Sequence, residues 1–496
     1  MMICYSLLML ARFICITIAV LLAAPAAAAE FQDDLKARRA RVLERLGPES
    51  MLILWSAPVR TYSNDVEYEF RQDSYLYYLT GIDQPDTILV LMPGNRQHKE
   101  ILFVLPPNPV REHWEGHILT PREATEMSGI ATVERTGDFE AFLAAVMSRR
   151  PFGAINAQEA QAFFGALENN RAKVALLLGP APRVGAEVTE PYRFVNRLKE
   201  RHDGFTALDA TPILDSLRQV KTAYELKVME ESARISSDAH MAGMRAAKPG
   251  AWEYEVEAAI EFTYKRNGAF DWGYPSIVGS GPNATVLHYN ASSRQMKDGD
   301  LLLVDAAANY KYITVDITRT YPINGRFSPV QREIYNLVFQ AHEESRKFAR
   351  PGVVVGDVHQ KSVDVIKQGL LKLGLITDAS GDQYRIWYTH GSNHWIGMDV
   401  HDVGDYRRPL EPGMTFVIEP GLYIRESALE NLPKTAENAA FIEKVRPAVL
   451  KYKDIGVRLE DSYVVTATGL RNLSERVPRT VEEIEAFMRT SAPASR

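Results

Sequence analysis

Two aspartates, Asp305 and Asp316, limit what this chain can fold into, because both lie in apolar, β-branched runs of one segment, DGDLLLVDAAANYKYITVDITRTYP. A DG turn signal precedes the first run and AANYK separates the two, so the segment is predicted to form a β-hairpin. If the turn is centred between Tyr310 and Lys311, the two aspartates face each other, with Cβ atoms about 4.5–5.5 Å apart. Two carboxylates at that distance repel unless a cation lies between them. The hairpin therefore predicts a metal site.

A second interpretation is that each aspartate caps a turn or pairs with Lys311 or Arg319. That explanation suits one aspartate better than two. Two further carboxylates in apolar surroundings favour a metal: Glu419 in TFVIEPGLY and Glu460 in GVRLEDSYVV. Each lies near a predicted strand end beside a turn signal. Together with the two aspartates they supply enough negative charge to neutralise two divalent cations.

The segment HGSNHWIGMDVHDVG, residues 390–404, holds His390, His394 and His401. The first two are four residues apart, as in helical zinc sites, but glycines interrupt the segment and no glutamate follows His390. HWIGMDVHD alternates like a strand, so only some of the three histidines are expected to bind metal. One imidazole among four carboxylates makes an oxygen-rich site, suited to Mn²⁺, Fe²⁺, Co²⁺ or Zn²⁺ rather than to a thiolate-selecting structural site.

The chain has 496 residues, enough for two or three domains. Residues 30–215 alternate strand-like runs (SMLILWS, DTILVLMPG, EILFVLPP) with helix-like segments such as DDLKARRARVLERL, which indicates an α/β domain. Residues 216–478 open with a long helix capped by Thr222 and Glu225, followed by a second helical run and by strands that include TVLHY. Helices on a mostly antiparallel sheet make this domain α+β. Residues 479–496 are expected to be a C-terminal tail.

The first 29 residues have the pattern of a secretory signal: an apolar run after Arg12, then small residues that offer cleavage after Ala29. A membrane anchor is the alternative, but Arg12 divides the run. Export, to a periplasm or to the medium, is therefore expected, with no stable anchor after cleavage. Both cysteines, Cys4 and Cys15, lie in this leader, so the mature chain would have no disulfide and no thiolate ligand. The net charge of −6 gives no sign of a nucleic-acid partner.

The segment GSGPNA, residues 279–284, fits the glycine spacing of a dinucleotide loop. The fit is weak, because Pro282 follows the second glycine and a strand, rather than a helix, is predicted next. We interpret it as a tight loop that aims His288 into the site.

Asp305, Asp316, His394, Glu419 and Glu460, in this order and with these flanking sequences, closely resemble the five ligands of the dinuclear pita-bread metallopeptidases. Within that superfamily, RQDSYLYYLTG at 71–81 and the segment 390–404 are similar to aminopeptidase P. The resemblance covers residues 31–475. It implies a C-terminal pita-bread catalytic domain preceded by an α/β N-terminal aminopeptidase P domain.

One departure from the family pattern is visible at Ala307, where the first ligand motif usually has glycine. A lost glycine beside a ligand could alter the hairpin or the approach of substrate. All five ligands remain, so inactivity does not follow.

The resemblance also implies a reaction: removal of any N-terminal residue that precedes proline, by a metal-bridged hydroxide whose proton Glu419 handles. His288 and His401 would stabilise the oxyanion or assist the leaving proline nitrogen. His390, Tyr423 and Arg458 would shape the proline side of the cleft, although Arg458 could instead pair with Glu460 or Asp461 and Tyr423 could belong to the core. Two divalent ions, Mn²⁺ above all, and a homodimer or homotetramer are implied by analogy.

Prolidase, which cleaves the same bond in dipeptides only, resembles the chain in its ligands. Trp395 and RQDSYLYYLTG favour the aminopeptidase. A creatinase-like hydrolase would not need all five ligands. A catalytically silent peptide-binding domain would be expected to have lost some of them.

Overall fold

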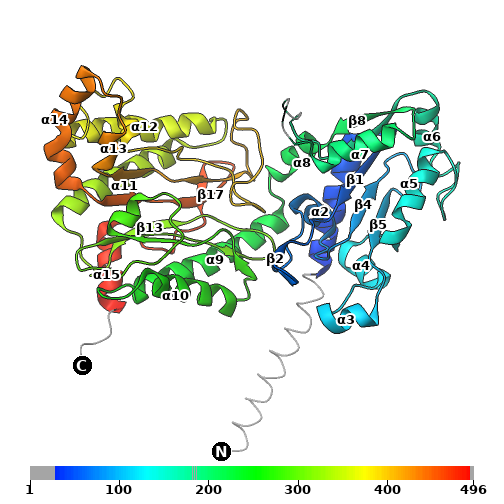
Figure 1. Ribbon diagram of the computed structural model, residues 1–496, viewed down its shortest axis with the longest axis horizontal. Coiled ribbons are helices and arrows are strands. Elements are labelled where there is room, and N and C mark those ends of the chain that lie inside the picture. The colour runs from blue at the N-terminus through cyan, green and yellow to red at the C-terminus, as the bar shows by residue number, and fades with distance from the viewer. Residues whose placement is uncertain (1–27, 181–182, 184, 186, 492–496) are drawn as a thin grey trace, which may run out of the picture. The chain divides into compact units, whose positions relative to one another are not determined.

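The computed structural model describes residues 28–180, 183, 185 and 187–491, and it divides into two compact units, the first ending at Leu217 and the second beginning at Arg218 (Figure 1). The boundary lies two residues beyond the predicted one. The expected leader lies outside the described residues except for residues 28 and 29. None of the helices in the described part of the chain combines the length and the apolar character needed to cross a membrane.

The first unit is built on one mixed six-stranded sheet. Its strands, in spatial order, are β6 (Thr132–Arg135), β5 (Glu100–Val104), β4 (Ile88–Leu91), β1 (Ser50–Trp55), β7 (Ala172–Leu176) and β8 (Phe205–Asp209). The three quoted strand-like runs form β1, β4 and β5, and DDLKARRARVLERL lies within a helix over residues 28–46, as expected. Buried Phe103, Phe139 and Phe142 pack in the core of this unit.

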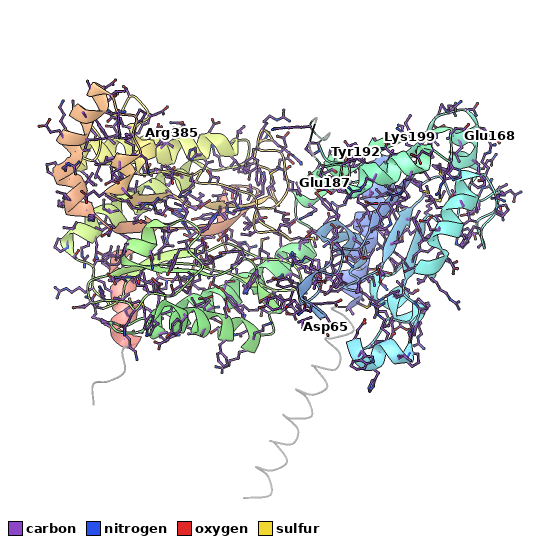
Figure 2. All side chains as sticks on the ribbon, viewed as in Figure 1. Asp65, Glu168, Glu187, Tyr192, Lys199 and Arg385 are labelled. Carbon is purple, nitrogen blue, oxygen red and sulfur yellow. The ribbon has the colours of Figure 1, made fainter. Side chains whose placement is uncertain are left out.

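The remaining helices of this unit are α2 (Ser74–Thr80), α3 (Pro109–Glu115), α4 (Pro121–Ser128), α5 (Phe139–Met147), α6 (Gln161–Glu168), α7 (Glu190–Lys199) and α8 (Thr211–Arg218), with a 3₁₀ turn η1 (Thr136–Asp138). A small hairpin of β2 (Thr61–Ser63) and β3 (Val66–Glu67) has Asp65 at its exposed turn (Figure 2). These elements confirm the α/β character of the N-terminal domain.

The second unit contains short antiparallel sheets. They are β10 (Ile277–Ser280), β11 (Leu301–Asp305) and β13 (Thr318–Pro322); β14 (Thr415–Ile418), β17 (Asp461–Val465) and β18 (Leu470–Asn472); β15 (Gly421–Ile424) and β16 (Ile455–Arg458); and β9 (Asp271–Trp272) with β12 (Ala308–Asn309). A bridge between Thr318 and Glu460 connects the first two sheets.

Helices cover these sheets: α9 (Ala223–Ala246), α10 (Glu253–Arg266), α11 (Pro329–Phe348), α12 (Val355–Leu373), α13 (Ser427–Glu430), α14 (Ala436–Tyr452) and α15 (Val481–Ser491), with 3₁₀ turns η2 (Gly281–Thr285) and η3 (Gln383–Ile386). Figure 1 shows β13 between α11 and α12 on one side and α9 and α10 on the other. The capping box of Thr222 and Glu225 begins α9 as predicted. Helices on antiparallel strands confirm the α+β class.

The hairpin of Asp305 and Asp316 forms, but its predicted register is wrong. Asp305 pairs with Thr318, not with Asp316. The turn consists of Lys311 and Tyr312, with φ of 49° and 67°. The register is thus shifted by two residues, and because side chains alternate with a period of two, Asp316 remains on the same face as Asp305.

Three further expectations are corrected by the structure. TVLHY is not a strand: Thr285 ends η2, and the next three residues form a bend and a turn. HWIGMDVHD is irregular, with a single bridge from Trp395 to Phe416. The C-terminal tail contains α15, whose Val481, Ile484 and Met488 are buried in the core of the second unit.

Candidate metal centre

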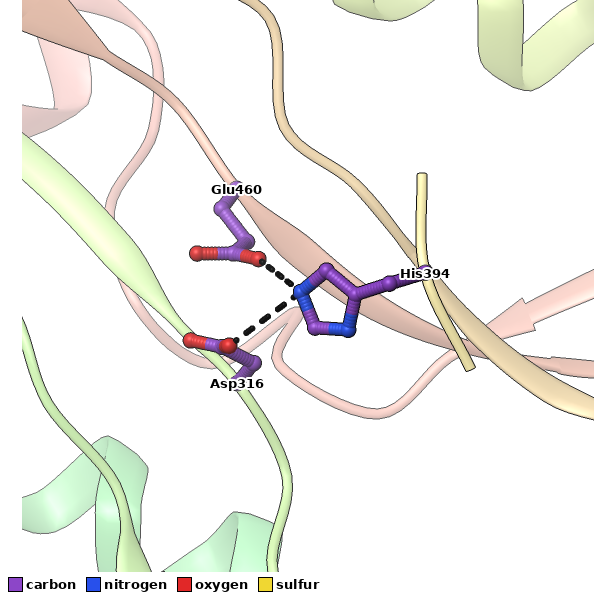
Figure 3. Close-up of side chains that lie close together, drawn as sticks. All are labelled: Asp316, His394 and Glu460. Carbon is purple, nitrogen blue, oxygen red and sulfur yellow. Dashed lines mark ion pairs between the residues drawn. The ribbon is translucent and has the colours of Figure 1, made fainter. Parts of the chain in front are cut away.

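Among the described residues, Asp316, His394 and Glu460 form a cluster that could hold a metal ion (Figure 3). Each offers one ligand atom, and these three atoms lie within 4.8 Å of one another. The Nε2 atom of His394 is 3.4 Å from Oδ2 of Asp316 and 3.7 Å from Oε1 of Glu460. All three residues are buried. Asp316 comes from the hairpin, His394 from the segment before β14, and Glu460 from the position just before β17. Residues 144 positions apart in the sequence (460 − 316) therefore share one site.

Glu419 and Asp305 adjoin this cluster. Oε1 of Glu419 lies 3.6 Å from Nε2 of His394, and its side chain is 16% exposed. Asp305 accepts a hydrogen bond from Arg458 at 2.5 Å and another from the hydroxyl of Tyr274 at 2.7 Å. The same hydroxyl lies 2.5 Å from Oδ1 of Asp316. The structure therefore brings all five predicted ligands to one place, with Asp305 also engaged by Arg458.

The local backbone explains why His394 meets Glu419. Residues 392–396 run beside β14: Ser392 accepts from the amide of Glu419 at 2.9 Å, and His394 accepts from the amide of Val417 at 3.0 Å. The side chain of Asn393 donates to the carbonyl of Val417 at 2.7 Å. This segment needs no regular strand, because single hydrogen bonds to β14 hold it.

The donor set fits divalent cations. Oε1 of Glu460 is buried and has no hydrogen-bond partner in the described part of the chain, although a buried acceptor normally has one. Burial, together with the charge of Glu460, raises the pKa of Asp316 well above its ordinary value and that of Glu419 to about 8. A positive charge placed among crowded carboxylates favours their ionised forms, so a bound cation would reverse these pKa shifts.

The pKa values of Asp305 and His394 are shifted in the direction that favours the charged form of each side chain. Burial opposes the charge of Asp305, but Arg458 and the hydroxyl of Tyr274 outweigh it and lower the pKa of this carboxyl. Burial likewise disfavours charge on His394, yet Asp316 and Glu460 raise its pKa well above the ordinary value. The imidazole thus lies in a strongly negative field, as expected for a ligand of a cation.

His390, Tyr423 and Arg458 form a hydrogen-bonded chain beside the cluster. Arg458 donates to the hydroxyl of Tyr423 at 2.9 Å, and that hydroxyl is 2.8 Å from Nε2 of His390. Nδ1 of His390 lies 2.7 Å from the carbonyl of Gly391 and must donate to it, so Nε2 accepts from Tyr423. Burial, then Arg458, lowers the pKa of His390 to about 3, which keeps this ring neutral.

Arg458 and Tyr423 both have structural contacts as well as a place beside the cluster. The alternative for Arg458, an ion pair with Glu460 or Asp461, is not what the structure shows: its ion pair is with Asp305, while Arg319 pairs with Asp461 at 2.6 Å. Tyr423 is buried in a small core cluster, and its hydroxyl faces the site at the same time.

His401 and His288 lie at the edge of the centre. The ring of His401 is 4.4 Å from that of His394, measured between centroids, and the two are nearly perpendicular. His288 is exposed and follows η2. Its neighbour Leu287 directs its carbonyl at Arg458, 3.5 Å away.

Tyr274 was not anticipated from the sequence. It lies in WGYPS, a loop whose Gly273 is required because an added Cβ would be 2.1 Å from Oγ1 of Thr314. A tyrosine between glycine and proline is only a weak signal of a loop, and nothing local indicates that its hydroxyl reaches two aspartates. Its contacts, which join Asp305 to Asp316, depend on the tertiary fold.

Comparison with known proteins agrees with this geometry. The profile of metallopeptidase family M24 matches residues 227–467, and that of the aminopeptidase P N-terminal domain matches residues 35–154. The Xaa-Pro aminopeptidase of Haemophilus influenzae is 32% identical over 466 residues, which cover 92% of this chain and 97% of that protein. The chain belongs to metallopeptidase family M24.

Other M24 relatives include human Xaa-Pro aminopeptidase 3, 30% identical over 88% of this chain and 81% of that one. The structure of Escherichia coli aminopeptidase P with the inhibitor Pro-Leu superposes with a TM-score of 0.77 at 31% identity, covering 93% of this chain and 98% of that chain. The aminopeptidase PepP of Pseudomonas aeruginosa has the same TM-score and coverage at 34% identity. The M24 assignment confirms the metallopeptidase class and the pita-bread fold inferred from the sequence.

Proposed function

We propose that this chain removes the N-terminal residue from peptides whose second residue is proline, by metal-dependent hydrolysis. The observation that carries the proposal is the buried cluster of Asp316, His394 and Glu460, flanked by Asp305 and Glu419, in an M24 chain similar over nine-tenths of its length to Xaa-Pro aminopeptidases.

The cofactor we propose is a pair of Mn²⁺ ions, because the donors are oxygen-rich with one imidazole. Asp305, Asp316, His394, Glu419 and Glu460 would hold them. Bound there, such cations lower the pKa of water and polarise a carbonyl group.

Glu419 is suited to take the proton of the attacking water. It is the most exposed of the five carboxylate and imidazole side chains, so water can reach it while its Oε1 stays 3.6 Å from Nε2 of His394. His401 and His288, at the edge of the centre, are placed to stabilise the oxyanion or to donate a proton to the leaving proline nitrogen.

The bond before proline is a tertiary amide, so it has no N–H for the enzyme to bind. Recognition on this side has to rely on shape and on the carbonyl oxygen. The uncharged rings of Tyr423 and His390 are joined by a hydrogen bond, and Arg458, paired with Asp305, donates to the Tyr423 hydroxyl. We assign these three residues to the proline side of the cleft.

The decisive experiment compares an Arg-Pro-Pro tripeptide with an Ala-Pro dipeptide, using mature protein stripped with EDTA and then resupplied with Mn²⁺. Release of the first residue from the tripeptide, lost with EDTA and restored by Mn²⁺, is expected. Cleavage of the dipeptide alone would identify a prolidase. No cleavage of either would indicate a peptide-binding protein without activity.

We further propose that the protein is exported, with residues 1–29 removed, to a periplasm or to the medium, and that it assembles as a dimer or tetramer. The leader pattern supports the first proposal. N-terminal sequencing of secreted protein tests the export and the cleavage. Light scattering of the purified chain tests the oligomeric state.

A further inference from the structure

Glu253, the first residue of α10, is a fully buried carboxylate outside the metal centre. Its two oxygens accept hydrogen bonds from the loop at 280–294. The donors are the amide and hydroxyl of Ser280 (both 2.7 Å), the side-chain amide of Asn283 (3.2 Å), the hydroxyl of Tyr289 (2.8 Å) and the amide of Arg294 (2.9 Å). One carboxylate therefore organises the beginning, middle and end of one loop.

The loop is also constrained around this carboxylate. The amide of Glu253 donates back to the carbonyl of Arg294 at 3.0 Å. The guanidinium of Arg294 donates to the hydroxyl of Ser280 and to Asp300, both at 2.6 Å. Gly281 has a φ of +54°, and a Cβ there would be 2.7 Å from Asp300. The loop conformation thus depends on a connected network in which Glu253 is the main acceptor.

This loop carries His288. Tyr289, the next residue, donates a hydrogen bond to Glu253, and Leu287, the preceding one, packs against the small core cluster that contains Tyr423. The ring of His288 is exposed and forms no hydrogen bond to the described residues. Its position at the edge of the metal centre is therefore set by the backbone of the loop rather than by contacts of its own.

We propose that Glu253 is a positioning residue, which holds the 280–294 loop so that His288 stays beside the substrate carbonyl. This inference rests on the proposed function of His288. Replacing Glu253 with glutamine keeps the shape but turns an amide NH₂ group toward donors that need an acceptor, and the unpaired donors weaken the loop. The loop would then hold His288 at the site for a smaller fraction of the time.

A double-mutant cycle separates positioning from general damage. We would measure kcat, KM and Mn²⁺ content for Glu253→Gln, His288→Ala and the double variant, with the tripeptide as substrate. Glu253→Gln alone should lower kcat at least about tenfold with little change in Mn²⁺ content. In the His288→Ala background, the same substitution should lower kcat by less than about twofold. An equal loss of kcat in both backgrounds would overturn the inference.

Hydrogen exchange tests the loop without relying on catalysis. Amides of residues 280–294 should exchange about tenfold faster in Glu253→Gln, while the rest of the second unit is unchanged. Unchanged exchange would overturn the inference even if His288 matters. If His288→Ala leaves kcat unaltered while the loop loosens, the assignment of His288 fails instead.

Two further variants distinguish the proposed effect from misfolding and from non-specific effects of changing a buried carboxylate. Tyr289→Phe removes one of the donors to Glu253 and the acceptor of the Ser293 amide, and should lower kcat less than Glu253→Gln, in the same direction. Glu485→Gln is the matched control: Glu485 is also buried and accepts from the amide of Phe327 and from Arg332, and it lies on α15. Its kcat should equal that of the unmodified protein.

Discussion

The hydroxyl of Tyr274 lies between two carboxylates, 2.5 Å from Oδ1 of Asp316 and 2.7 Å from Oδ1 of Asp305. Burial and the charges of these two aspartates raise the pKa of Tyr274 well above its ordinary value, so the phenol keeps its proton and remains a donor. It lessens the repulsion between carboxylates that the M24 fold holds on one face of a hairpin.

Tyr274→Phe should therefore destabilise the metal-free protein more than the Mn²⁺-loaded protein. Loss of a half-buried donor between two carboxylates should cost about 1–3 kcal/mol in the free energy of unfolding when EDTA is present. Bound cations would offset part of this loss. Thermal unfolding with EDTA and with Mn²⁺ measures the difference.

Tyr321→Phe is the control for this measurement. Tyr321 lies on β13 and is more deeply buried than Tyr274, and its hydroxyl has no hydrogen-bond partner among the described residues. Removing this hydroxyl should leave the free energy of unfolding unchanged, with or without metal. Equal destabilisation by both substitutions would contradict the bridging role of Tyr274.

Glu419→Gln should leave the fold intact and reduce kcat by about 10²–10⁴, the range typical for loss of a general base. The amide cannot accept the proton of the attacking water. Steady-state kinetics with the tripeptide, together with metal analysis of the same sample, tests this. Near-normal turnover with full metal content would show that another group acts as the base.

Asp402 is expected to stabilise the second unit strongly. Its buried carboxylate accepts from Arg218 at 2.5 Å and from Lys221 at 2.8 Å. Asp402→Asn would remove the buried negative charge that Arg218 and Lys221 share. Asp399, which also pairs with Arg218, is 43% exposed and compensates poorly for that loss. Removing one member of a buried ion pair typically costs about 3–5 kcal/mol in the free energy of unfolding. Urea unfolding of the full chain at pH 7 measures the loss.

The stabilisation by Asp402 should depend on pH. Burial would raise its pKa, but Lys221 and Arg218 outweigh burial and lower it. A carboxyl with a lowered pKa stabilises the fold above the unfolded value, about 3.9, and the contribution is lost as pH falls through the folded pKa. The difference between Asp402→Asn and the unmodified protein should thus shrink below about pH 4. Asp405→Asn, at an exposed ion pair with Arg407, should change little at any pH.

Gly397→Ala should also destabilise the segment that carries His394 and His401. An added Cβ would lie 2.1 Å from Oδ2 of Asp402 and 2.8 Å from Nζ of Lys221, so the ion pair would have to move. We expect a lower thermal midpoint and a lower kcat. Gly391→Ala, where a Cβ meets nothing within 4 Å, is the control, and equal effects of the two would contradict the packing argument.

The sequence by itself singled out the candidate ligands and determined the larger elements. Asp305, Asp316, Glu419 and Glu460 stand out because a carboxylate in an apolar, strand-forming run is costly unless it is paired or bound to metal. The capping box at Thr222 is equally local, because its hydrogen bonds span three residues. Such features depend on residue type and short spacing, which the sequence displays directly.

Only the tertiary structure decided the register of the hairpin and the partners of the site residues. A two-residue hairpin turn of this kind requires positive φ at both positions, and Lys311 and Tyr312 lack the glycine or asparagine that signals it. In the same way, Glu253 has the local pattern of an acidic residue in the first turn of a helix. Its donors, up to 41 positions away, are selected when the folded chain brings them together, which no local propensity encodes.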